Sequence, residues 1–154
     1  MKLSTRGRYS LRAMIDLNQN QSSSIKPICL KDISVRQRIS LQYLEQLFNK
    51  LKKAGLVKST RGAYGGYYLS CKAKNISSGE IIRAVEGPMM LVDCVDDVIQ
   101  NNKRIRNKCD LIEDCVIKIF LEDISKKINK HLDDISLEDL CNITINTSER
   151  RMDD

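Results

Sequence analysis

Residues 40–69, SLQYLEQLFNKLKKAGLVKSTRGAYGGYYL, predict a capped helix that is followed directly by a β-hairpin. In the first half of this stretch, apolar residues recur every three or four positions, the spacing of one face of an amphipathic helix. This face consists of Leu41, Leu44, Leu47, Phe48 and Leu51. Ser40 is a good N-cap, lysines near the end suit the helix dipole, and Gly55 terminates the helix.

The second half of the stretch predicts a small wing. The runs LVKST (residues 56–60) and GYYLS (residues 66–70) are rich in Val, Thr and Tyr and are separated by a glycine-rich turn. Three of the seven glycines, Gly62, Gly65 and Gly66, allow a tight loop to lie close to another backbone. Arg61 stands where it could enter a nucleic-acid groove. The alternative is an ordinary hairpin turn that carries an arginine by chance.

Two further helices are expected before residue 40. Residues 9–18 have apolar side chains at near-helical spacing, and the polar stretch that follows them, residues 19–27, is typical of a loop. CLKDISVRQRIS (residues 29–40) predicts a short helix with Leu30 and Ile33 facing inward. A short helix, a tight turn and a capped amphipathic helix have the outline of a helix-turn-helix.

The rest of the chain predicts three more helices. SSGE (residues 77–80) is a capping box that opens a helix ending at Gly87. A long helix is expected from near Leu111, because apolar residues recur every three or four positions as far as Ile135. Such a helix with one apolar stripe packs along another long helix, here either its copy in a dimer or a core element of the same chain. Ser136 caps a short helix, and a frayed tail is expected to follow it.

These elements predict a mainly α fold with a small β-hairpin wing, a winged helix-turn-helix plus a long dimerisation helix. We expect one domain, divided into a winged helix-turn-helix (residues 1–72), a linking helix (73–92), a cysteine-bearing loop (93–115), a dimerisation helix with a short C-terminal helix (111–142) and a tail (143–154).

The charge of the chain is unevenly distributed. Residues 1–92 contain 16 Lys and Arg against 5 Asp and Glu, whereas residues 93–154 contain 10 against 15. A basic first part favours an anionic partner such as nucleic acid, although uneven surface charge alone has the same signature. No apolar run is long enough to span a bilayer and the N-terminus lacks a secretory apolar core, so we expect a cytoplasmic protein with no membrane partner.

Six cysteines in a cytoplasmic chain indicate metal ligation, redox sensing or core packing rather than disulfides. Cys94, Cys109 and Cys115 fall in the irregular segment and at the start of the long helix, which suggests ligation. Zinc prefers shorter CxxC spacing, a thiol switch needs only two cysteines, and soft thiolates also suit an iron–sulfur cluster. We assign the other three cysteines, Cys29, Cys71 and Cys141, to packing. A small redox or metal-carrier protein is the rival of a different class, but the chain lacks a credible catalytic pair, so we expect no enzyme.

The segment of residues 32–69 closely resembles the Rrf-two family of winged-helix regulators, through YLEQLF, GLV and RGAYGGY in succession. The motifs MKLSTRGRYSLRAM, SSGEIIRAVEGP and LDDISLEDL extend the resemblance over nearly the whole chain. The resemblance implies a homodimeric transcription regulator that binds a double-stranded DNA operator with its wing and dimerises through a long helix.

The resemblance also implies roles for individual residues in DNA binding. Ser40, Tyr43 and Glu45 match the front of the recognition helix, and Arg61 matches the wing arginine that enters the minor groove, with Gly62, Gly65 and Gly66 shaping the wing. A helix N-terminus suits phosphates, and arginine suits a narrow minor groove. Glu45 either reads a cytosine amino group or pairs with a nearby lysine.

Within the family, IscR-like iron–sulfur regulators bind a [2Fe–2S] cluster through three cysteines in this region. The resemblance therefore implies that Cys94, Cys109 and Cys115 are ligands, that the cluster modulates operator affinity in response to iron–sulfur or redox status, and that cluster-assembly proteins are partners. CDLIEDC (residues 109–115) reproduces the family interval, whereas the interval from Cys94 to Cys109 contains the basic insert NNKRIRNK. A cluster-free or thiol-switch repressor of cysteine metabolism, of the CymR type, is the alternative.

The fourth ligand is not evident from the sequence. Lys118 and Arg8 stand where relatives carry a ligating histidine and an acidic ligand. His131 lies sixteen residues after Cys115, about 24 Å along a helix axis, and is too far away within one subunit. Nearby carboxylates or a group of the partner subunit remain candidates; the carboxylates are Asp93, Asp110, Glu113 and Asp114.

Overall fold

The computed structural model describes residues 3–21, 26–62, 64–91, 99–100, 103–104 and 115–150, the backbone alone for 99–100, 103–104 and 144–150. The helices are α1 (Thr5–Asn20), α2 (Leu30–Gln37), α3 (Leu41–Lys53), the 3₁₀ turn η1 (Ala73–Asn75), α4 (Ser78–Glu86), α5 (Val116–Asp134) and α6 (Leu137–Arg150). The strands are β1 (Val57–Thr60), β2 (Gly66–Leu69), β3 (Ile99–Gln100) and β4 (Lys103–Arg104), paired as β1–β2 and β3–β4, both antiparallel. The fold class is therefore confirmed: a mainly helical chain with a two-stranded wing.

The helix-turn-helix consists of α2, a three-residue turn and α3. Arg38 ends α2 in the left-handed conformation with φ of 54°, which reverses the chain direction within a single residue. Ile39 is buried, and its carbonyl oxygen accepts a hydrogen bond from Ser34 Oγ at 2.6 Å. Ser40 then caps α3 by accepting from the Tyr43 backbone N–H at 3.3 Å. The predicted cap and the predicted helix are both present.

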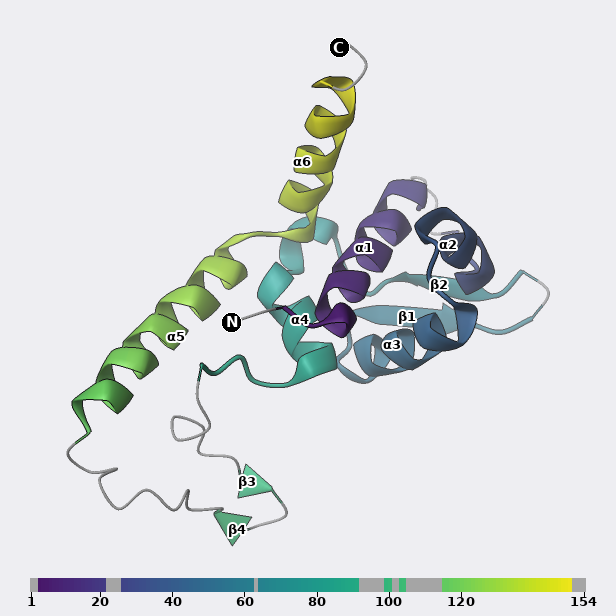
Figure 1. Cartoon of the computed structure of the whole chain (residues 1–154). Coiled ribbons are helices and arrows are strands. Elements are labelled where there is room, and N and C mark those ends of the chain that lie inside the picture. The colour runs from purple at the N-terminus through teal and green to yellow at the C-terminus, as the bar shows by residue number, and fades with distance from the viewer. Residues whose placement is uncertain are drawn as a thin grey trace.

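The core is formed by one face of α1, α2, α3, α4 and α6 together with residues of the hairpin and of the adjoining turns. The fully buried side chains include Met14, Leu17, Ile33, Leu44, Phe48, Leu51, Ile76 and Ile81. Figure 1 shows α1, α2, α3 and α4 gathered around the β1–β2 hairpin, while α5 extends away from this body. The last helix completes the core, because α6 packs against α1 and η1 and contributes Leu137 and Cys141 to the same buried cluster.

Serine caps account for where most helices begin. Ser4 caps α1 by accepting from the backbone N–H groups of Arg6 and Gly7. At α4, the capping box expected from SSGE is present, with Ser77 and Glu80 exchanging hydrogen bonds. At α6, Ser136 and Asp139 form the same reciprocal pair. Each cap satisfies N–H groups that have no partner inside the helix.

Several expectations require correction. The first helix begins at Thr5 rather than near residue 9, because Ser4 supplies a cap that the broken apolar pattern does not reveal. Leu41, placed on the buried face of α3, is 39 % exposed because it lies in the first turn, ahead of the core contacts. Cys115 is the extended N-cap of α5, so this helix begins at Val116 and not near Leu111. The backbone of α6 continues to Arg150, where a frayed tail was expected from residue 143.

The long helix α5 is mostly uncovered within the chain. Ser125 is its only buried residue in the part of the helix that the structure describes. Ile124, Ile128 and Leu132 are half-buried on the side nearer α4, whereas apolar side chains of the first turns are 58–74 % exposed. These exposed side chains, called the α5 apolar face below, are Val116, Ile117, Ile119 and Phe120. No helix in the described ranges is long and apolar enough to cross a membrane.

Candidate nucleic-acid interface

The N-terminal end of α3 presents polar side chains to solvent. Ser40 and Glu45 are exposed, and Tyr43 is half-buried. Tyr43 packs edge-to-face on Tyr9 with ring centroids 5.9 Å apart, and the Arg12 guanidinium lies 5.6 Å from the Tyr9 centroid. Because the buried face of α3 holds the helix to the core, the three predicted DNA-contacting residues share one solvent-facing end of a rigid helix.

The position of α2 relative to α1 is set by a buried carboxylate. Asp16 on α1 is 3 % exposed and binds the Arg36 guanidinium through Nε at 3.0 Å and Nη2 at 2.6 Å. Gln37 Nε2 donates to the same carboxylate at 2.9 Å. The hydrogen bond to Asp16 raises the pKa of Arg36 above its ordinary value. This ion pair holds the first helix of the helix-turn-helix in place, and its importance was not foreseen from the sequence.

The wing is anchored at its base and free at its tip. Its register pairs Val57 with Leu69 and Thr60 with Gly66. Tyr67 and Ile28 exchange two backbone hydrogen bonds, at 2.8 and 2.9 Å, and a Cβ on Gly66 would lie 2.5 Å from the Ile28 carbonyl oxygen. A side chain at position 66 would therefore displace the segment that anchors the wing.

The turn of the wing explains the other two glycines and leaves Arg61 unpaired. Gly62 has φ of 111°, a conformation that side chains disfavour, and a Cβ on Gly65 would lie 2.6 Å from the Thr60 carbonyl oxygen. Arg61 is exposed and takes part in none of the hydrogen bonds or ion pairs found among the described residues. The glycine-rich turn thus holds a free guanidinium at the end of the hairpin.

Two charged residues near α3 add detail. Arg38, which sequence reasoning missed, is exposed in the turn just before Ser40 and holds the left-handed conformation. The residue that ends a helix in this conformation is usually glycine or asparagine, so an arginine between the two helices of the motif was a signal of a role at the surface. Glu45 takes part in none of the ion pairs found in the described part of the chain. The pKa of the Tyr67 hydroxyl is raised, mainly by burial of the side chain and also by the negative charge of Glu45.

Of the three predicted cluster ligands, the structure describes only Cys115. Its side chain is half-exposed at the N-cap of α5 and makes no capping hydrogen bond. Cys94 and Cys109 lie outside the described residues, as do the four candidate carboxylates. Within the described ranges, no group of three or more potential metal ligands is found. A helix N-terminus favours negative charge, so the place of Cys115 fits an anionic metal–thiolate centre.

The remaining cysteines divide into two kinds. Cys141 is 5 % exposed in the core, its sulfur lies 3.2 Å from Asn18 Nδ2, and burial raises the pKa of its thiol. The packing role predicted for it agrees with this burial. Cys29 and Cys71 are exposed, which corrects the packing role predicted for them. Cys29 caps α2 and Cys71 follows β2, so both lie at element ends rather than on a buried face.

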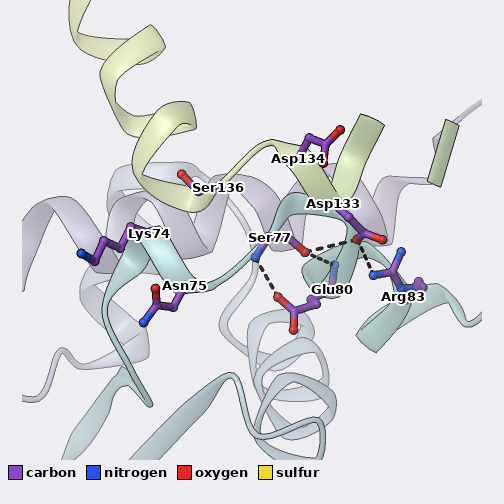
Figure 2. Close-up of a pocket in the computed structure, with 8 residues that line it drawn as sticks. All are labelled: Lys74, Asn75, Ser77, Glu80, Arg83, Asp133, Asp134 and Ser136. Carbon is purple, nitrogen blue, oxygen red and sulfur yellow. Dashed lines mark hydrogen bonds and ion pairs between the residues drawn. The ribbon is translucent and has the colours of Figure 1, made fainter. Parts of the chain in front are cut away.

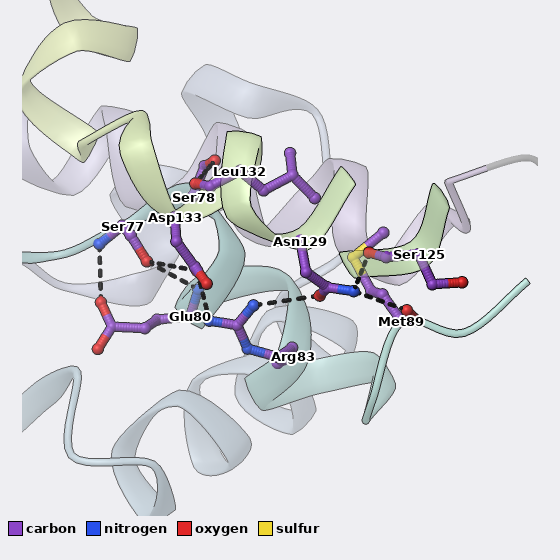
Figure 3. Close-up of polar contacts among 9 residues, drawn as sticks. All are labelled: Ser77, Ser78, Glu80, Arg83, Met89, Ser125, Asn129, Leu132 and Asp133. Atoms are coloured by element: carbon purple, nitrogen blue, oxygen red, sulfur yellow. Dashed lines mark hydrogen bonds and ion pairs between the residues drawn. The ribbon is translucent and has the colours of Figure 1, made fainter. Parts of the chain in front are cut away.

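A polar junction joins α4, α5 and the start of α6. Figure 2 shows the depression at this junction, in which Glu80 accepts a hydrogen bond from the Ser77 backbone N–H and Arg83 pairs with Asp133 at 2.5 Å. Figure 3 shows the continuation along α5, in which Arg83 donates to Asn129 and Asn129 donates to the Met89 carbonyl oxygen at 2.9 Å. These contacts hold α4 and the strap against α5.

The segment of residues 87–91, called the strap below, runs from α4 towards the cysteine-bearing region. Besides the Asn129 bond, the Leu91 backbone N–H donates to Ser125 Oγ at 3.3 Å. Just before the strap, the last residues of α4 contact α1 and α3. Glu86 accepts from the Gly7 N–H at 2.9 Å, and Lys50 on α3 donates to the Val85 carbonyl oxygen at 2.9 Å. The end of α4 and the strap together thus connect α5 with the ends of α1 and α3.

Comparison with known proteins places this geometry in a family. The profile of the Rrf2 family, described as an iron-dependent transcriptional regulator, matches residues 3–143. A putative HTH-type transcriptional regulator of Haemophilus influenzae is 42 % identical over 142 residues, covering 92 % of this chain and 87 % of the relative. The HTH-type transcriptional regulator IscR of Vibrio vulnificus is 40 % identical over 153 residues, covering 98 % of this chain and 84 % of IscR.

Solved structures give the same answer for the fold. CymR, the global cysteine regulator of B. subtilis, superposes with a TM-score of 0.70 at 36 % identity, covering 93 % of this chain and 98 % of CymR. IscR of T. potens superposes with a TM-score of 0.68, also at 36 % identity, covering 94 % of this chain and 88 % of that one. With α3 and the wing presented as described, and with these relatives matched along nearly the whole chain, the protein belongs to the Rrf2 (Rrf-two) family and is a DNA-binding transcription regulator, not an enzyme.

Proposed function

We propose that the protein acts in the cytoplasm as a homodimer that binds a pseudo-palindromic operator, with a [2Fe–2S] cluster modulating its DNA affinity. One observation carries the DNA-binding part: the exposed end of α3 and the unpaired Arg61 are held on one rigid body by the Ile28–Tyr67 backbone pair. In this arrangement Ser40, Tyr43 and Glu45 meet the major groove while Arg61 enters the adjacent minor groove, with Gly62, Gly65 and Gly66 holding the wing in shape.

The homodimer is supported by the α5 apolar face. Four large apolar side chains at 58–74 % exposure within the first five residues of a helix are unusual on the surface of a monomeric protein. A second copy of the same helix is the partner that a two-fold symmetric operator requires, because two equal half-sites need two equal recognition helices.

The cluster is proposed to be bound by Cys94, Cys109 and Cys115 with a fourth ligand that is not cysteine. A bound cluster would supply a redox-active and acid-labile centre at this place. Cys115 immediately precedes α5, so its ligation constrains the first turn of the helix that carries the α5 apolar face. The strap contacts the same helix, and the end of α4 that precedes the strap contacts the ends of α1 and α3. Occupied and empty forms can differ in DNA affinity only through such differential contacts.

The DNA-binding proposal is tested with Arg61→Ala and with Lys74→Ala as a control, since Lys74 is an exposed cation on η1, outside the wing and α3. Arg61→Ala is expected to weaken operator binding by about 1–3 kcal/mol. The slope of log affinity against log salt concentration should become shallower by about one, the effect of losing one cationic contact. Lys74→Ala should leave both unchanged. Equal behaviour of the two variants would remove the role assigned to the wing.

The cluster proposal is tested by iron and acid-labile sulfide in anaerobically purified protein. Single alanine variants of Cys94, Cys109 and Cys115 should lose both, whereas a Cys141→Ala variant should retain them. Because the fourth ligand is weaker than a thiolate, the wild-type colour should bleach readily in air.

A cluster-free repressor of the CymR type is the second candidate, because CymR superposes on this chain about as well as IscR does. Full operator affinity in all three cysteine variants, with colourless wild-type protein from anaerobic cells, would favour that candidate. Loss of iron from Cys109→Ala and Cys115→Ala alone would show that the basic insert has removed Cys94 from the site.

A further inference from the structure

The tip of the wing carries an aromatic ring that the fold does not use. Tyr64 is 93 % exposed, the highest value among the large apolar side chains of the described residues. It takes part in none of the hydrogen bonds or ring contacts found in that part of the chain. A ring so exposed contributes almost nothing to folding, so it is available to a partner outside the monomer.

The backbone holds this ring in a defined place beside Arg61. The turn is closed by a hydrogen bond from the Gly65 N–H to the Gly62 carbonyl oxygen at 2.9 Å, and Tyr64 lies inside it. Arg61 directly precedes the turn. Figure 1 shows the β1–β2 hairpin extending past α2 and α3 to a free tip. The base of the hairpin is fixed by the edge-to-face pair of Phe48 and Tyr67, with centroids 4.9 Å apart.

We propose that Tyr64 packs its ring against the deoxyribose wall of the minor groove next to the site entered by Arg61, as a neutral determinant of operator affinity. This inference rests on the proposed wing role of Arg61. Apolar side chains of minor-groove proteins contact sugars and base edges in this way, and an aromatic ring offers a large apolar area with few rotatable bonds. An uncharged contact releases no counterions, so its contribution has no salt dependence of its own.

Two substitutions at position 64 separate the ring from its hydroxyl. Tyr64→Ala is expected to weaken operator binding by about 10- to 50-fold, from the area of the lost ring. Tyr64→Phe should stay within about threefold of wild type, because the ring is retained. The slope of log affinity against log salt should be unchanged in both, in contrast to Arg61→Ala. Thermal unfolding should be nearly unaffected, because the side chain is 93 % exposed and takes part in no hydrogen bond or ring contact found among the described residues.

Several outcomes would overturn the proposal. These are wild-type affinity in Tyr64→Ala, an equal loss in Tyr64→Phe, or a change of oligomeric state without a change in operator affinity. If Arg61→Ala loses affinity while Tyr64→Ala does not, the wing reaches the groove and only the role of Tyr64 fails. If both variants bind normally, the proposed wing function itself fails.

The absence of tryptophan from the chain allows a direct second measurement. Tyr64→Trp places a single tryptophan, which can be excited selectively over tyrosine, at the wing tip, and Ile143→Trp places one on α6 as a control. Saturating operator should shift the emission of the first variant and protect it from acrylamide, with no change in the second. Unprotected emission from Tyr64→Trp on bound operator, or equal protection of both variants, would refute burial of the tip in the groove.

Discussion

Replacing Arg36 by alanine would leave a buried carboxylate without its cation. Asp16 is 3 % exposed and receives three contacts from Arg36, two from Nε at 3.0 Å and one from Nη2 at 2.6 Å. After the substitution, only the amide groups of Gln37, at 2.9 Å, and Asn20, at 3.4 Å, still donate to it.

The two partners of this pair should not be equivalent. Removing one partner of a buried ion pair lowers the free energy of unfolding by about 3–5 kcal/mol. Because two amide donors still bind the Asp16 carboxylate, we expect a loss of about 2–4 kcal/mol for Arg36→Ala. Removing Asp16 instead leaves a guanidinium that can be hydrated, because 37 % of the Arg36 side chain is already exposed. For Asp16→Ala we therefore expect about 1–2 kcal/mol. The double variant should resemble Asp16→Ala.

Urea unfolding followed by circular dichroism measures these differences, with Lys31→Ala, an exposed cation on the same helix, as a control expected within about 0.5 kcal/mol of wild type. A loss of 2–4 kcal/mol is a large part of the total stability of a domain, about 5–15 kcal/mol. Two outcomes would refute the view that Asp16 is the partner that depends on the ion pair for its burial. The first is an equal loss of unfolding free energy in the two single variants, and the second is a loss in the double variant that equals their sum.

Three further predictions concern other parts of the molecule. Phe120→Asp should give a folded monomer, measured by light scattering. The Phe120 side chain is 58 % exposed in the single chain, so the aspartate is tolerated there, whereas it would be a buried, unpaired charge in the proposed dimer. An intact dimer would show that the interface lies elsewhere. Maleimide should modify Cys29 quickly and Cys141 slowly, since Cys141 is buried and its pKa is raised, and mass mapping would detect the reverse order. Hydrogen bonds from Ser136 lower the pKa of Asp139 below its ordinary value of 3.8, so its stabilising effect is present above that pH and is lost as the pH falls through the lowered pKa. The difference in melting temperature between wild type and Asp139→Asn should therefore shrink in acid, and a constant difference would contradict the capping role.

Local patterns were sufficient for the winged helix-turn-helix, because each element carries its own signal. Ser40 marks the start of α3, the apolar spacing marks its buried face, and the glycines mark the wing. The features that were missed depend on contacts between distant residues. The Asp16–Arg36 pair joins two helices, and no single-helix pattern reveals that Asp16 is buried. The exposure of Cys29 and Cys71 follows from their place at element ends.

The contribution of α6 to the core has a consequence for how the chain folds. Leu137 is fully buried, its N–H binds the Ile76 carbonyl oxygen at 2.8 Å, and the Ser78 N–H binds the Ile135 carbonyl oxygen at 2.8 Å. The DNA-binding body therefore stays incomplete on the ribosome until the residues that follow α5 have emerged. These contacts close a chain loop of about sixty residues, which slows folding relative to a domain built from neighbouring helices. A fragment that ends after α4 would leave the contact site of Leu137 exposed and would be prone to aggregate, so the winged helix-turn-helix and the start of α6 form one folding unit.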